Sequence, residues 1–129
     1  MRIELRKALP PHHTPIADPD TPWDGPGNVA RLRNGETAAY YRKMFAWVDP
    51  EANPNTKSAY KFPHHMVDEE GNIGAANVRA CIAAIAALNG ARGGTKIPDE
   101  DKPGVYRHVA THLRDAGIKP PKLKRSTRG

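Results

Sequence analysis

Residues 75–90 read AANVRACIAAIAALNG, and this stretch decides the fold. Alanine has the highest helix propensity of the amino acids, and larger apolar residues recur at intervals of four, three and three. These residues are Val78, Ile82, Ile85 and Leu88. They share one face of an expected helix over 75–89, which Gly90 ends because glycine readily adopts the left-handed conformation at helix C-termini. Small side chains elsewhere allow close packing on several sides, so we expect this helix at the centre of the folded body.

A last helix is expected over about 100–116, downstream of the central one. Ile97-Pro98-Asp99 is a typical helix start. The stripe of this helix is formed by Val105, Val109 and Leu113. Gly117 ends the helix, and two prolines after it prevent a restart.

Upstream of the central helix, the pattern predicts short elements. Asp24 can cap a short helix around 29–32, and 36–44 is a second helical stretch. The run 45–48 is aromatic and β-branched and predicts a strand, which we pair with a second strand over 59–67. Residues 68–72 are expected to form a turn whose acids favour the start of the next helix. The fold class is therefore α+β: a small helical domain with a short two-stranded β element.

The two ends of the chain differ from this body. Thirteen prolines are about twice the usual share, and the X-Pro pairs within 1–22 predict an extended arm. The expected organisation is an arm over 1–22, a compact domain over 23–117 and a basic tail over 118–129. Since the arm has little apolar material to hold itself in place, we expect it to contact another chain. The candidate partner-binding residues are Ile3, Leu5, Leu9 and Trp23.

The net charge of +6 is concentrated in the tail. Five positive residues and no acid lie there, which leaves +1 for the rest of the chain. A tail of this kind can neutralise phosphates without sequence preference, or dock on an acidic partner, or remain solvated. The candidate nucleic-acid-binding residues are Lys122, Lys124, Arg125 and Arg128.

The remaining composition restricts the location of the protein. The lone Cys81 lies within the helical pattern, so it predicts a core thiol and no intrachain disulfide. No apolar run reaches the roughly 20 residues of a membrane helix, and residues 1–7 lack a signal-peptide core. We therefore expect no membrane partner and use of the protein in the compartment where it is made.

Histidines are the first candidates for chemistry. His108 and His112 are four apart on the last helix, and His64-His65 form a second pair, a spacing that can bind a metal. The acid of an H-E-x-x-H motif is absent and the helical pair flanks the apolar stripe, so core or interface packing is the favoured interpretation. We predict no metal and no cofactor. The pair His12-His13 is expected to face solvent or a partner. The only serines, Ser58 and Ser126, lie in no catalytic motif, so an enzyme is not expected.

Several motifs together resemble a module of tailed-bacteriophage head proteins. They are WDG at 23–25, VARL at 29–32, YRKMFAWVD at 41–49, YKFPHH at 60–65, and LNGARGG at 88–94 leading into Ile97-Pro98. The resemblance covers about residues 23–117. In that family the module is found attached to prohead proteases of the HK97 type and in related head-gene products.

The resemblance implies a location in the virion, in the phage head, after synthesis in the host cytoplasm. No protease domain with its catalytic serine and histidine precedes the module in this sequence, so cleavage is not implied. A free-standing copy with arms is most similar to a capsid decoration or cement protein, a structural protein that would bind the major capsid protein and copies of itself. The alternatives are a genome-facing nucleic-acid-binding accessory protein, or a non-catalytic partner of the maturation protease.

Overall fold

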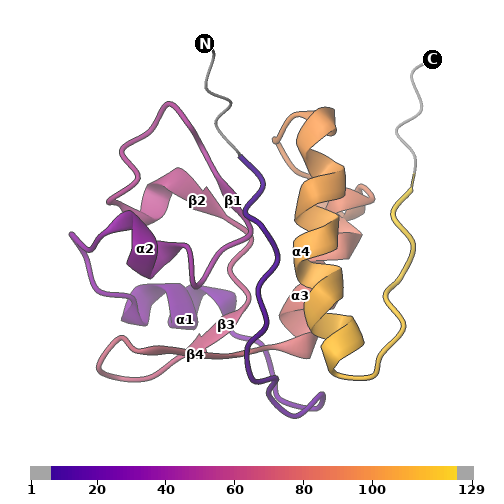
Figure 1. Ribbon diagram of the computed structural model, residues 1–129, viewed down its shortest axis with the longest axis horizontal. Coiled ribbons are helices and arrows are strands. Elements are labelled where there is room, and N and C mark those ends of the chain that lie inside the picture. Colours follow the sequence, from indigo (N-terminus) through magenta and orange to yellow (C-terminus); the bar gives the residue numbers. More distant parts are fainter. Residues whose placement is uncertain (1–6, 125–129) are drawn as a thin grey trace.

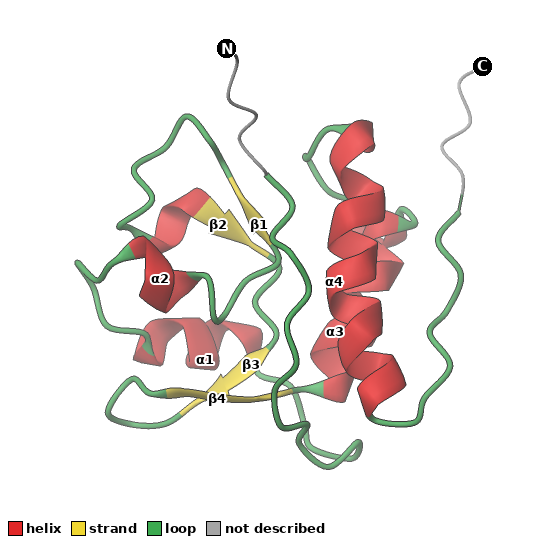
Figure 2. Cartoon of the chain, in the orientation of Figure 1, coloured by secondary structure: helices red, strands yellow, loops and turns green. Residues whose placement is uncertain are grey.

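The computed structural model describes residues 7–124 and shows an α+β fold in two halves (Figure 1). One half holds α1 (Gly25–Arg31), α2 (Ala38–Tyr41) and two small antiparallel sheets. These sheets are formed by β1 (Trp47–Val48) with β2 (Tyr60–Lys61) and by β3 (His65–Val67) with β4 (Ile73–Ala76). The other half is the helix pair α3 (Val78–Leu88) and α4 (Lys102–Asp115). Short 3-10 turns lie at Lys57–Ala59, Ala91–Gly93 and Asp99–Asp101. The N-terminal segment runs between the halves (Figure 2).

The packing of α3 on α4 confirms the central and last helices. Val105, Val109 and Leu113 are fully buried, as their stripe predicted. The stripe predicted for α3 was wrong at Ile82, which is 39% exposed. The buried positions recur at intervals of three, four and three instead, so Cys81 takes the place that Ile82 was expected to fill, and the prediction of a core thiol is confirmed.

The β structure confirms one prediction and corrects another. The pairing of Trp47 with Lys61 and of Val48 with Tyr60 is the sheet that the sequence predicts. The second half of the expected strand, however, pairs with β4, a strand that the sequence analysis missed. The central helix was expected from residue 75, but the backbone stays extended through Asn77, whose side chain caps the helix by accepting from the amide of Ala80. The extra pairing with β3 outweighs the helix propensity of the two alanines before it.

The acids at 68–70 accordingly lie in a hairpin turn, not at a helix start. The Asp68 carboxylate accepts backbone hydrogen bonds from Glu70 and Asn72, at 3.0 and 2.8 Å, and these bonds lower the pKa of Asp68. The hydrogen bonds accepted by Asp68 close the turn between β3 and β4.

The N-terminal segment is extended, as predicted, but the described part of it packs on its own body. Leu9 donates its amide to the carbonyl of Ala46 at 2.9 Å, and its side chain is only 2% exposed. Further along, Ile16 bridges to Ala76 of β4. The prolines keep the backbone extended, so its N–H and C=O groups are free to pair with strands of the same chain. The expectation that Leu9 binds a partner is therefore wrong: this side chain belongs to the core.

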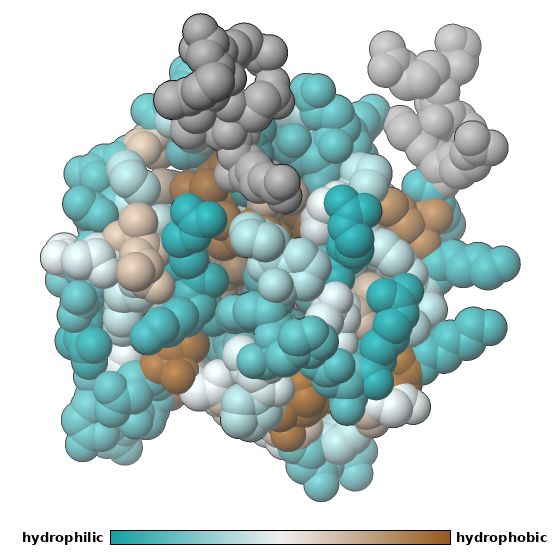
Figure 3. Space-filling model, in the orientation of Figure 1, coloured by the Kyte–Doolittle hydropathy of each residue, from teal (hydrophilic) through white to brown (hydrophobic). Residues whose placement is uncertain are grey.

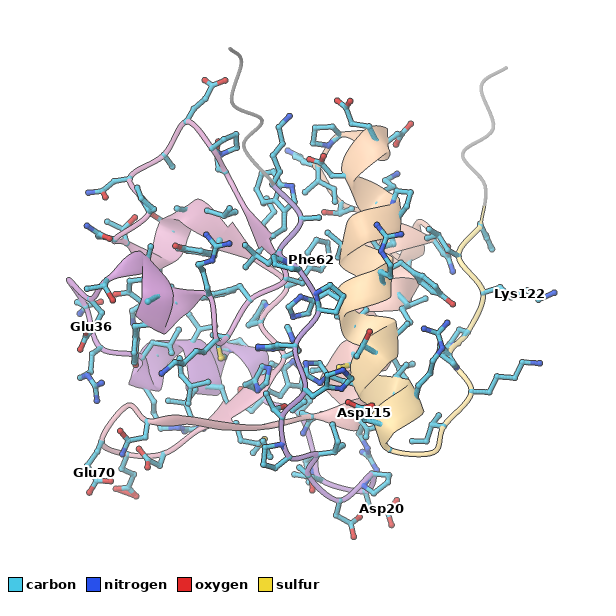
Figure 4. The ribbon with its side chains drawn as sticks, viewed as in Figure 1. Asp20, Glu36, Phe62, Glu70, Asp115 and Lys122 are labelled. Carbon is cyan, nitrogen blue, oxygen red and sulfur yellow. The ribbon has the colours of Figure 1, made fainter. Side chains whose placement is uncertain are left out.

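The C-terminal segment also returns along its own helices. Ile118 and Leu123 pack against the α3–α4 core. The side chain of Asn89 donates to the carbonyl of Lys122 at 2.9 Å and accepts from the amide of Lys124 at 2.7 Å. The Lys122 side chain points away from the body (Figure 4).

Two apolar clusters form the core, one in each half. One fills the space between α3 and α4, and the other lies under α1 and α2 with Tyr41, Met44 and Tyr60. The surface seen in Figure 3 is mostly hydrophilic, with small, separate apolar areas. Within residues 7–124, no helix is long and apolar enough to cross a membrane.

Candidate metal centre

Five histidines meet where the two halves and the N-terminal segment come together. His64 immediately precedes β3 and His65 is the first residue of that strand, and His108 and His112 lie one turn apart on α4. All four are buried, with exposed fractions of 0 to 1%. The fifth is His12, whose ring centroid lies 4.9 Å from that of His108 and 5.1 Å from that of His112. Residues from three distant parts of the sequence thus share one site.

Local backbone features bring the adjacent pair to this site. Phe62 adopts a positive φ of 65°, and Pro63 follows it. His64 then bonds to two other segments, since its amide donates to the carbonyl of Met44 and its carbonyl accepts from Asn77. The rings of His64 and His65 lie on the same side, with centroids 4.5 Å apart, although neighbours in a regular strand point to opposite faces.

Backbone carbonyls fix the protonation pattern of three rings. The Nδ1 atoms of His64, His65 and His108 lie 2.9, 2.8 and 2.9 Å from the carbonyl oxygens of Phe62, Gly74 and Leu9. A carbonyl only accepts hydrogen bonds, so each Nδ1 carries the proton. In the neutral ring the Nε2 atom then carries a lone pair, which is free to accept a hydrogen bond or to bind a metal.

Two of these lone pairs face each other. The Nε2 atoms of His64 and His108 are 3.2 Å apart. With both protons on Nδ1, neither atom has a hydrogen to donate to the other. Moving one proton to Nε2 would instead set the Nδ1 lone pair of that ring against a carbonyl oxygen. A cation between the two Nε2 atoms removes the conflict.

Protonation of the rings does not supply that cation at neutral pH. Burial lowers the pKa of His64 well below its usual value, and neighbouring histidines lower it further. Burial likewise lowers the pKa of His65 and His108 to about 4 and that of His112 to about 3. The pKa of His12 is lowered by burial and by His13. The cluster is therefore neutral at pH 7.

Several nitrogens in the cluster also lack partners among the described residues. They are Nε2 of His12, Nε2 of His65 and both ring nitrogens of His112. Buried polar atoms are nearly always hydrogen-bonded, and leaving one unsatisfied costs about 1–3 kcal/mol. Packing in an ordinary core does not explain why these ring nitrogens lack hydrogen-bond partners.

The geometry fits a transition-metal ion. One nitrogen from each of His12, His64, His108 and His112 can be chosen so that all four lie within 4.8 Å of one another. Tetrahedral zinc with Zn–N bonds of about 2.0–2.1 Å places its ligand nitrogens about 3.3–3.4 Å apart, close to the 3.2 Å between His64 and His108. Imidazole ligands suit Zn, Cu, Ni and Fe. The bonds from Nδ1 to backbone carbonyls are of the kind that orient metal-binding histidines and leave the Nε2 lone pair for the metal.

The histidine expectations have mixed outcomes. Packing of His108 and His112 in the interior is confirmed, while the absence of a metal stays a prediction. His13 is exposed as expected, with Nδ1 2.6 Å from a carboxylate oxygen of Asp115. Its neighbour His12 is half-buried in the cluster, so the expectation that it faces solvent or a partner was wrong. The signal available in the sequence was the recurrence of three histidine pairs in so short a chain.

The other predicted site residues do not gather at one place. Trp23 is half-buried against the α1–α2 core, and Lys122 and Lys124 are exposed on the C-terminal segment. Ile3, Leu5, Arg125 and Arg128 lie outside the described residues.

Comparison with protein-family models, curated proteins and solved structures found no match for this chain.

Proposed function

We propose that this protein is a metal-binding structural protein, in which a divalent ion, zinc first, is bound by His12, His64, His108 and His112. The observation that carries the proposal is the 3.2 Å contact between two Nε2 atoms whose protons are both held elsewhere by carbonyls. Zinc is first because four nitrogens within tetrahedral reach, with no sulfur among them, match its preferred geometry.

The bound ion would link three segments that are otherwise held together by short stretches of backbone pairing. His12 belongs to the N-terminal segment, His64 to the α1–α2 half and the other two ligands to α4. The free energy of metal binding then adds directly to the free energy of folding, as in other structural zinc sites. This supports a structural role over a catalytic one.

Thermal unfolding of metal-free and zinc-loaded protein tests the proposal. At free zinc 100-fold above Kd the gain is about 2.7 kcal/mol, on the order of 10 °C in Tm. Elemental analysis should give one zinc per chain. His108→Ala should abolish both effects, whereas the matched variant His13→Ala, changed outside the cluster, should keep them. A melting temperature that zinc leaves unchanged in the wild-type protein would contradict the proposal.

We further propose that the protein acts in a tailed-phage head, as a decoration or cement protein bound to the major capsid protein. The support is the ordered set of motifs, together with the positions these motifs occupy in the fold. Asp24 caps α1, the FPHH stretch supplies two cluster histidines, and Gly90 ends α3 with a φ of 101°. The resemblance thus rests on residues that determine the fold and the candidate metal centre.

The structure changes how the shell-binding proposal is tested. Removing the whole segment 1–22 would take Leu9 out of the core and His12 out of the cluster, so a loss of binding would report misfolding. Removing only residues 2–6, which include Ile3 and Leu5, keeps every described residue. We expect this truncation to lower occupancy on purified head shells without changing the Tm of the free protein. Unchanged occupancy would count against an N-terminal contact with the shell.

A further inference from the structure

A cavity of about 450 Å³ opens beside the histidine cluster. His12 and His65 line the part of the cavity next to the histidine cluster. The rest of the lining includes Thr14 and Pro15 of the N-terminal segment and Lys43 and Ile73 of the α1–α2 half. The cavity is therefore a route by which a small molecule can reach the cluster.

His12 is the least constrained of the four proposed ligands. It lies on a segment without helix or strand, and it is half-buried where the other three are buried. His64 and His108 are held by bonds from Nδ1 to carbonyls, and His112 by its place on α4. The ring of His12 makes no hydrogen bond with another described residue. Of the four ligands, it is the one that can most easily leave a bound ion.

The charge of the metal centre favours an anion in the place of His12. Four neutral imidazoles leave a divalent ion with a net charge of +2, and the described ligand set contains no carboxylate. A buried, uncompensated charge is strongly unfavourable, so an anion near the ion is stabilised. Lys43 adds a further positive charge at the cavity wall.

We infer that the centre has one exchangeable position, and that a carboxylate entering this cavity takes the place of His12 on the metal. The inference rests on the proposed metal site and deepens it. The carboxylate belongs either to a small organic acid or to an Asp or Glu side chain of a partner protein, and both present the same oxygen donor.

Cobalt-loaded protein makes the exchange visible, because the visible absorption of Co²⁺ changes with its ligands. Sodium acetate should change the spectrum in a saturable way, and sodium perchlorate at equal ionic strength should not. His12→Ala should bind acetate more tightly, since the competing ligand is gone. Lys43→Ala should weaken acetate binding about fivefold, and Lys61→Ala, an exposed lysine outside the cavity, should not change it.

The outcomes separate this inference from the proposed metal site. A cobalt spectrum that forms normally but does not respond to acetate, in the wild-type protein and in His12→Ala, overturns the exchange and leaves the metal site standing. Failure to bind cobalt and zinc overturns both. A short Glu-containing peptide that binds more tightly than acetate assigns the carboxylate to a partner side chain, and the reverse order assigns it to a small acid.

Discussion

At the scale of the residue, the protein shows how burial changes what a histidine can do. An exposed imidazole such as that of His13 makes a hydrogen bond with the Asp115 carboxylate at the surface. The buried rings of His64 and His108 are held neutral, and their protons are fixed by carbonyl oxygens. The result is a group of oriented lone pairs with no proton to share, which is the state that a metal ion requires.

The pH dependence of the metal-free protein follows from the same residues. The folded-state pKa is about 4 for His65 and His108 and about 3 for His112, below the usual 6.5 of the unfolded chain. Below pH 6.5 the unfolded state therefore binds more protons than the folded state, so the free energy of unfolding decreases as the pH decreases. We expect a loss on the order of 1 kcal/mol per buried histidine between pH 6.5 and 5.5, and little change above pH 7.

Urea denaturation of the metal-free protein at pH 7.5, 6.5 and 5.5 measures this effect. His112→Leu should weaken the pH dependence, because one titrating group is removed, whereas Ile82→Ala, which removes no titrating group, should leave it unchanged. A denaturation midpoint that stays constant from pH 7.5 to 5.5 would show that the cluster histidines are not held neutral by folding.

At the scale of the element, α3 shows which part of the helix periodicity matters. Ile85 is fully buried against α4, while Ile82 is 39% exposed. Ile85→Ala should lower the free energy of unfolding by about 2–5 kcal/mol, because it leaves a cavity in the core. Ile82→Ala should change it by about 0.5 kcal/mol, as at a surface position. Urea denaturation of the two variants compares them, and equal losses would contradict the packing described for α3.

Local patterns predicted the elements of the fold better than the contacts between them. The α3–α4 pair could be predicted because each apolar stripe lies within one stretch of sequence. β4 could not, since Ala75 and Ala76 favour a helix and become a strand only through pairing with β3. The candidate centre was harder still: all three histidine pairs were visible, but nothing local indicates that His12 reaches the other two pairs across the chain.

At the scale of the whole molecule, the described parts of both end segments, 7–22 and 118–124, pack on the folded body. The segment after α4 is held by Asn89, Lys122 projects outward from it (Figure 4), and Lys124 is exposed. If the tail binds DNA as a genome-facing accessory protein would, replacing Lys122, Lys124, Arg125 and Arg128 with Ser should strongly weaken the binding. The slope of log K against log salt concentration should become less negative by about 3–4, as expected for four lost phosphate contacts.

Fluorescence anisotropy with a short duplex, measured from about 50 mM salt upward, tests the tail. A control variant carries Lys61→Ser and Lys96→Ser, which change exposed lysines of the body and should leave binding as it is. No binding by the wild-type protein at the lowest salt would dismiss the genome-facing alternative.

The route of the N-terminal segment also constrains how the chain can fold as it is made. Leu9 and His12 leave the ribosome well before His108, yet the carbonyl of Leu9 is bonded to the ring of His108. The segment around Leu9 must therefore stay exposed until α4 has been made. Long-range contacts of this kind form slowly, and a growing chain is open to aggregation until they do. The emergence of α4, rather than that of any earlier element, sets the moment at which the core around Leu9 and His12 can close.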